Sequence, residues 1–171
     1  MGESKDKLAQ LFELIHGGNK EVHLKGTFQS ERGIGPVNYF FWLFMAIPKS
    51  KEKSGFTLEI IPNNGKIQWR RKFAKKRFWT QTKMENGLFI ERKGLIQFEF
   101  EIKQIEEGWT YNFKRLKFLR IDIPSWLSVK PTAVNKVISE TKWEFEVKTT
   151  SPFGSQILKY WGTAEIQNRE E

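Results

Sequence analysis

The chain has 171 residues, of which 29 are basic and 20 acidic, so its formal net charge is +9. Hydrophobic residues make up 39% of the chain and aromatic residues 15%, a composition that argues against disorder and suffices for the core of one domain over residues 1–171. Cysteine is absent, which excludes disulfides, thiolate metal sites and a cysteine nucleophile.

The first predicted element is a helix over residues 1–18. Leu8, Leu11 and Ile15 follow helical spacing, and two glycines end the pattern. This segment lacks the long apolar core of a signal peptide, so we expect a cytoplasmic protein.

A second helix is predicted over residues 36–48, between two prolines. It is apolar nearly all round, which is typical of a helix that is buried in a core, lines a cavity or faces lipid. Its longest apolar run has nine residues, too few for a membrane span of roughly 20. We expect Phe40, Phe41 and Phe44 to contribute to an apolar cavity.

From residue 55 to 166 the pattern is that of successive strands. Ile96, Phe98 and Phe100 alternate with polar residues, and Asn86-Gly87 predicts a tight hairpin turn. The stretch from Ile123 to about Lys136 is expected to be non-strand. Because the strands follow one another without helices between them, the sheet should be antiparallel. The predicted fold is mainly β (α+β), a curved sheet of about eight strands in a barrel or half-barrel, with the two N-terminal helices packed on it or capping it.

The segment from Lys66 to Lys83 concentrates the charge of the protein. It holds eight basic residues and no acidic one, which indicates an anionic partner. Its alternation predicts a hairpin with one apolar and one basic face. The residues expected to meet an anionic group are Arg70, Arg71, Lys72, Lys75, Lys76 and Arg77. The residues expected to make aromatic contacts or line the cavity are Trp69, Phe73 and Trp79.

Arg71 is the exception within this hairpin, because its phase places it among the apolar side chains. A guanidinium in a core stays charged and needs a partner. That partner is expected to be Glu91 or Glu140, or else an anionic ligand.

Several short motifs keep a recognisable order along the chain. They are Trp69-x-Arg71-x-Phe73, Gly94, Ile123-Pro124-Ser125-Trp126-Leu127, Glu140, Pro152-Phe153-Gly154 and Tyr160-x-Gly162. This order resembles an uncharacterised bacterial domain-of-unknown-function family whose members occur alone or fused behind saccharopine-dehydrogenase-like modules. The resemblance covers roughly residues 55–166, with a weaker match over 25–47. It implies a bacterial protein of the same fold and brings no activity with it.

The remaining motifs do not favour catalysis. The two histidines, His16 and His23, sit in no recognisable catalytic motif, and neither a phosphate loop nor a carboxylate metal cluster is visible. We therefore expect no enzyme, no cofactor and no metal. The favoured function is binding of a hydrophobic or amphipathic anionic ligand of the lipid class, or of an acidic membrane surface through the basic hairpin, which would place the protein at the membrane periphery. The alternatives are a single-strand nucleic-acid binder and a structural or protein-interaction domain, whose partner the sequence does not name.

Overall fold

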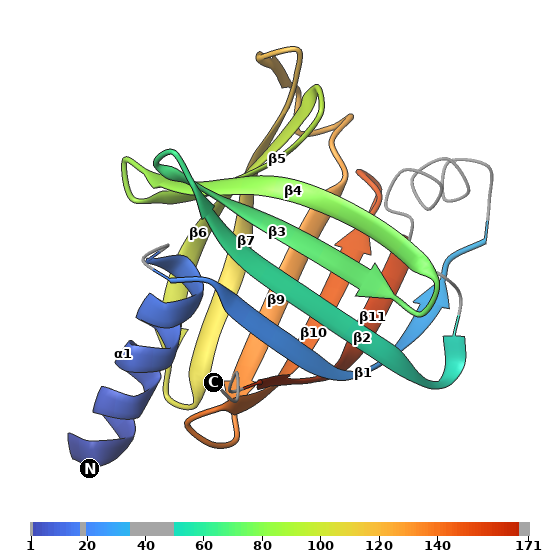
Figure 1. Ribbon diagram of the computed structural model, residues 1–171. Helices are drawn as coiled ribbons and strands as arrows, with labels where there is room; N and C mark the ends of the chain where they lie inside the picture. Colours follow the sequence, from blue (N-terminus) through green and yellow to red (C-terminus); the bar gives the residue numbers. More distant parts are fainter. Residues whose placement is uncertain (1, 18–19, 35–49, 168–171) are drawn as a thin grey trace.

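The computed structural model describes residues 2–17, 20–34 and 50–167 (Figure 1). One helix and eleven strands lie within these ranges. In chain order they are α1 (Gly2–His16), β1 (Val22–Arg32), β2 (Ser50–Asn63), β3 (Lys66–Phe73), β4 (Lys76–Glu85), β5 (Leu88–Lys93), β6 (Ile96–Ile105), β7 (Gly108–Phe118), β8 (Ile121–Ile123), β9 (Lys130–Val137), β10 (Lys142–Thr150) and β11 (Gln156–Ile166).

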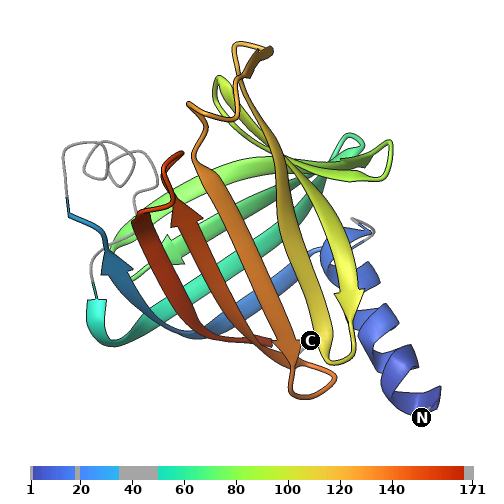
Figure 2. The ribbon, with the colours of Figure 1, turned by 180° about the vertical axis from the view of Figure 1, so that it is seen from behind.

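The strands form one antiparallel sheet in the order β6-β5-β4-β3-β2-β1-β11-β10-β9-β7-β8. A further pairing of β6 with β7 closes ten of these strands into a barrel, and β8 continues the sheet from β7 outside the ring (Figures 1 and 2). The predicted mainly β antiparallel fold is confirmed, and the choice between barrel and half-barrel is settled in favour of a closed barrel.

Alternation along the strands sorts the side chains to the two faces of the barrel wall. Phe56, Leu58 and Ile60 of β2 are buried, as are Trp69 and Phe73 of β3. Asn86 and Gly87 both have positive φ, as the predicted two-residue hairpin turn requires. On β7 the register against β6 shifts so that Lys114 becomes an extra residue, which is a β-bulge.

The prediction of about eight strands is too low for the eleven that the structure describes, and β8 and β9 are among those that it missed. Both lie in or beside the segment expected to be non-strand, where Pro131 and the weak alternation of β9 gave no strand signal. At Pro131, β9 pairs with β10, whereas its ladder with β7 extends only as far as Ala133. A proline is tolerated in a strand where the backbone pairs with a neighbour on one side only. Pro131 lies at such a position, so β9 can still complete the ring.

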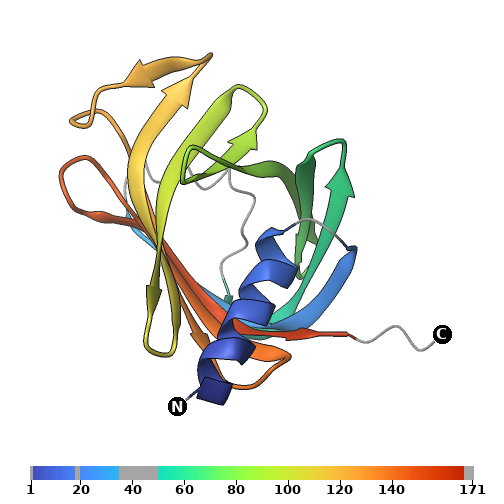
Figure 3. The ribbon, with the colours of Figure 1, turned by 90° about the vertical axis from the view of Figure 1, so that its left-hand side faces the viewer.

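The single described helix, α1, crosses one end of the barrel (Figure 3). Leu8, Leu11 and Ile15 are buried at the helical spacing that the sequence indicates, and His16 is buried at the C-terminal end. The predicted helix over residues 36–48 lies outside the described residues, and so do Phe40, Phe41 and Phe44. The described residues contain no helix long and apolar enough to cross a membrane.

Candidate ligand site in the barrel interior

The barrel encloses a cavity of about 140 Å³. Aromatic side chains dominate its lining, with Phe56, Trp69, Phe73 and Tyr160 among them. The lining runs from Ile15 of α1 at one end of the barrel to residues near the opposite strand ends, namely Lys93 of β5 and Pro131 and Thr132 of β9. We call the α1 side the helix end and the opposite side the distal end.

Three polar side chains from adjacent strands meet within this aromatic lining. The Nη1 atom of Arg71 lies 2.8 Å from Oε1 of Glu91 and donates to Oγ1 of Thr80, also at 2.8 Å. Thr80 in turn donates its hydroxyl proton to Oε1 of Glu91 at 2.8 Å. The side chains of Arg71 and Glu91 are only 11% and 19% exposed, so the pair is shielded from water on most sides.

Arg71 also stacks on the aromatic lining. Its guanidinium carbon lies 4.8 Å from the centroid of the Trp69 ring and 5.3 Å from that of Phe78. Cation–π contacts of this kind strengthen when they are shielded from water. The guanidinium is therefore held by a carboxylate, a hydroxyl and two rings, which is the environment that a buried arginine requires.

Lys93 adds a second cation to the cavity. Glu91 and Lys93 are two residues apart on β5, and both line the interior. The Nζ atom of Lys93 lies 4.9 Å from the centroid of Phe78. Burial lowers the pKa of Lys93, and the nearby charge of Arg71 lowers it further, against the opposing effect of Glu91. Two cations and one carboxylate give this cluster an excess positive charge.

At the helix end, a buried hydrogen bond joins His16 of α1 to Tyr111 of the barrel wall. Nδ1 of His16 lies 2.9 Å from the carbonyl oxygen of Phe12 and must donate to it, so Nε2 accepts the hydroxyl proton of Tyr111. Burial lowers the pKa of His16 to about 4, which keeps the ring neutral near pH 7. Burial likewise raises the pKa of Tyr111, and it raises that of Tyr160 to about 12.

Two donors in the lining stay unsatisfied by the described part of the chain. Nε1 of Trp69 and Nε1 of Trp109 are buried and have no acceptor there, although both rings line the cavity. A buried N–H without a partner carries a free-energy penalty that a ligand oxygen or a water molecule would remove.

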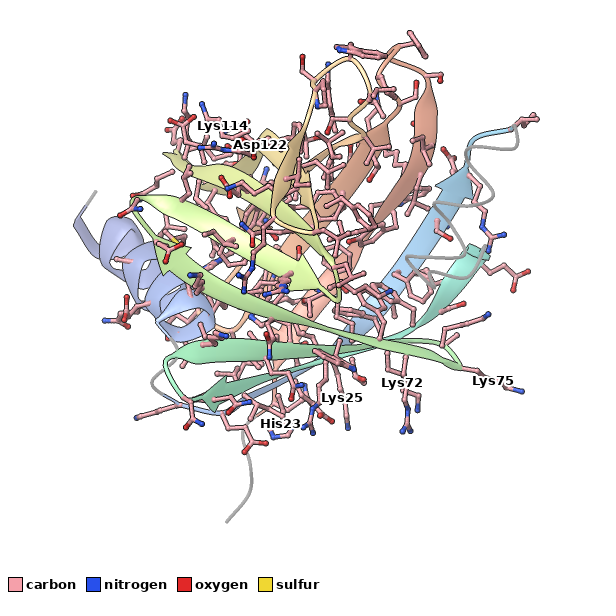
Figure 4. The ribbon with its side chains drawn as sticks, turned by 90° about the horizontal axis from the view of Figure 1, so that it is seen from above. His23, Lys25, Lys72, Lys75, Lys114 and Asp122 are labelled. Carbon is pink, nitrogen blue, oxygen red and sulfur yellow. The ribbon has the colours of Figure 1, made fainter. Side chains whose placement is uncertain are left out.

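The other basic residues of the hairpin lie on the outside of the barrel. Arg70, Lys72 and Arg77 are exposed, because alternation turns them away from the face that carries Arg71. Lys75 and Lys76 lie at the exposed β3–β4 turn. Figure 4 shows Lys72 and Lys75 projecting outward on the same side of the molecule as Lys25 of β1. The structure thus separates Arg71 from the other five residues that the sequence analysis grouped around one anion.

Trp79 also differs from the expectation of a cavity contact. It is 51% exposed on the outer face, since its neighbours Phe78 and Thr80 occupy the interior positions of β4. Trp69 and Phe73 do line the cavity. Of the two carboxylates considered for Arg71, the structure pairs it with Glu91, and Glu140 lies in the exposed connection between β9 and β10.

Sequence reasoning missed several polar residues of the cavity, among them Thr80, Lys93 and Tyr111. Lys93 could have been found, because it continues the interior phase of Phe89 and Glu91 along β5. Glu99 is buried on the outer wall, where its carboxylate oxygens lie 2.7 Å from Nε of Arg115 and 3.0 Å from Nζ of Lys117. Among the residues that the structure describes, no group of three or more metal-ligating side chains occurs.

These features define a class of protein, a closed antiparallel β-barrel with an aromatic interior cavity that holds an ion-pair cluster. The chain belongs to the family "Domain of unknown function (DUF4166)", whose model matches residues 5–163. A search of curated proteins finds no match.

The fold is similar to that of a protein of unknown function of the DUF3598 family from Nostoc punctiforme, solved as a crystal structure. The TM-score is 0.54 at 8% sequence identity, over 85% of this chain and 47% of that chain. At this identity the likeness concerns the fold alone, and this chain spans about half the length of its structural neighbour.

Proposed function

We propose that this protein is a non-catalytic module that binds an amphipathic anion of the lipid class inside its barrel. The single observation that carries the proposal is the cluster of Arg71, Glu91 and Lys93 within an otherwise aromatic cavity. Small-molecule sites are typically apolar concavities with a few convergent polar groups. An acid group would meet the excess positive charge of the cluster, and the apolar part of the ligand would contact the rings.

The two cations have different roles in this proposal. Arg71 is engaged by Glu91 and Thr80, so it chiefly stabilises the wall. Lys93 lies nearer the distal end, where a ligand would enter, and its ammonium group is the one that would pair with a carboxylate or phosphate oxygen. The N–H of Trp69 is a further donor within the lining.

The size of the cavity sets an expectation for the ligand. An engineered protein cavity of roughly 150 Å³ holds benzene, and the cavity here is of similar size. The apolar part of the ligand is therefore a short chain or a single ring, unless the rest of a longer chain extends beyond the distal end.

Two experiments test the proposal. Native mass spectrometry of protein purified without detergent should show an excess mass that extracts into organic solvent. Calorimetric titration with straight-chain carboxylates should then show an affinity that rises about fourfold with each added methylene until the cavity is full, because burying one methylene contributes about 0.8 kcal/mol.

The role of Lys93 is tested by comparing each carboxylate with the alcohol of the same length. The native protein should favour the acid by about tenfold or more, the value of a charge-assisted hydrogen bond, and Lys93→Met should remove that preference. Lys72→Met, on the outer face, is the matched control and should retain it. A clean apo mass together with no binding of either series would mean that the interior is only a structural core.

The proposal includes a cytoplasmic location at the periphery of an acidic membrane, with the basic outer face of β3 and β4 near anionic lipid. The bacterial source and the kinship with proteins fused to saccharopine-dehydrogenase-like modules rest on the sequence resemblance and are part of the proposal. Single-strand nucleic acid remains the alternative for the outer face, where Trp79 lies beside Arg70 in the β3–β4 register.

A further inference from the structure

The connections of an antiparallel barrel divide into two sets, one at each end. At the helix end the fully described connections between strands span residues 63–66, 85–88, 105–108 and 137–142. At the distal end they span residues 73–76, 93–96, 118–130 and 150–156. Figures 1 and 2 show the β5–β6 and β7–β8 hairpins rising away from α1.

Large apolar side chains are exposed mainly at the distal end. Six of them in its connections are more than half exposed, namely Leu95, Leu119, Ile121, Trp126, Leu127 and Phe153. Among the described connections at the helix end, Ile138 alone is exposed to that degree. The distal residues come from three separate connections on one edge of the sheet, and closure of the barrel arranges that edge around one end. Exposed apolar groups gathered in this way mark an interaction site.

The charges of the two ends have opposite signs. The distal connections carry five basic residues against one acidic residue, Asp122. The basic residues are Lys75, Lys76, Arg120 and Lys130, together with Lys93, whose side chain lines the cavity. The helix-end connections carry two basic residues, Lys66 and Lys142, against four acidic ones. Asp122 itself lies within 4 Å of both Arg115 and Lys117, which offset its charge. The apolar end of the barrel is therefore also its cationic end.

We propose that the distal end docks on an anionic membrane surface, with the exposed apolar side chains inserted among the lipids and the basic residues against the headgroups. Aliphatic side chains together with tryptophan and surrounding lysines match the chemistry of a membrane interface. Four of the six exposed residues are aliphatic and offer no ring on which a nucleic-acid base could stack. Docking by this end goes beyond the cavity ligand and differs from contact through the flat face of the basic hairpin, since Trp79 and Met84 are the only large apolar residues exposed on the described strands β3 and β4.

The test is co-sedimentation of the full chain with vesicles of phosphatidylcholine alone or mixed with phosphatidylserine. We expect binding to the mixed vesicles that weakens as salt is added, and much weaker binding to the neutral ones. The double variant Trp126→Ser/Phe153→Ser should lose at least tenfold in affinity. The matched control, Ile105→Ser/Ile138→Ser at the helix end, should bind like the parent. Both pairs of positions are exposed, and circular dichroism melting verifies that each variant is folded.

The contribution of the basic residues to membrane docking is tested separately. Lys75→Gln/Lys76→Gln should lower affinity for the mixed vesicles about 30-fold, since each basic residue near an anionic surface contributes about 1 kcal/mol. Lys93→Met, which should remove the acid preference of the cavity, should cost far less vesicle affinity, so the two proposals can fail independently. Equal loss in the Ile105/Ile138 control, no binding to anionic vesicles, or binding to single-stranded oligonucleotides in place of vesicles would each overturn membrane docking by this end.

Discussion

Arg71 lies on the inner face of the barrel wall and its neighbour Arg70 on the outer face. Replacing each by alanine compares how much an inner and an outer arginine contribute to stability. Arg71→Ala removes the ion pair with Glu91, the hydrogen bond to Thr80 and the contacts with the Trp69 and Phe78 rings. Arg70→Ala removes an exposed side chain whose Nε donates to Gln68 at 2.9 Å.

The expected loss of stability in Arg71→Ala depends on the Glu91 carboxylate, which the substitution leaves buried without its partner. Removing one member of a buried ion pair costs about 3–5 kcal/mol, because the other charge stays buried without compensation. Arg71 is 11% exposed and Glu91 19%, so water can reach part of the pair and the lower end of that range, about 3 kcal/mol, is expected. Arg70→Ala should change the free energy of unfolding by no more than about 0.5 kcal/mol.

Urea denaturation followed by tryptophan fluorescence measures both variants. With a slope of about 2 kcal/mol per molar urea, Arg71→Ala should lower the midpoint by about 1.5 M and leave the slope unchanged. The double variant Arg71→Met/Glu91→Leu should lose less stability than the sum of the two single substitutions, since it removes both charges together. If Arg71→Ala unfolded at the same midpoint as Arg70→Ala, the assignment of Arg71 to the stability of the wall would be refuted.

Two further predictions concern His16 at the helix end and the close approach of β1 and β11 at Gly162. Because burial depresses the pKa of His16 from 6.5 to about 4, the unfolded chain binds the proton more readily, so stability should fall by on the order of 3 kcal/mol as pH drops from about 6.5 to 4. His16→Gln, which keeps an acceptor for Tyr111 but does not titrate, should flatten that part of the pH profile, and an unchanged profile would contradict the buried neutral ring. Gly162→Ala should destabilise the protein or prevent folding, because the added Cβ would lie 1.9 Å from the carbonyl oxygen of Thr27 on β1. Gly55→Ala, with nothing within 4 Å of the new methyl group, is its control, and equal melting temperatures for the two variants would refute the close approach of β1 and β11.

The sequence by itself determined on which side of the wall the residues of β3 lie. A strand alternates its side chains with a period of two, so Trp69, Arg71 and Phe73 share the inner face and Arg70 and Lys72 the outer one, whatever the rest of the chain does. That inner position predicted that the Arg71 guanidinium needs a partner, either a carboxylate or an anionic ligand, and the structure pairs it with Glu91. Local turn chemistry likewise predicted the tight turn at Asn86-Gly87, because both positions require positive φ.

Only the tertiary structure decided how these strands meet. Pairing of β1 with β11 and of β7 with β9 closes the ring, and β9 takes part although its sequence alternates weakly and begins beside a proline. The tertiary structure also places His16 of α1 against Tyr111 of β7, 95 residues away in the chain. It also collects the apolar side chains of distant connections at one end. These contacts are long-range, and no local pattern of hydrophobicity or turn residues specifies which strand becomes the neighbour of which.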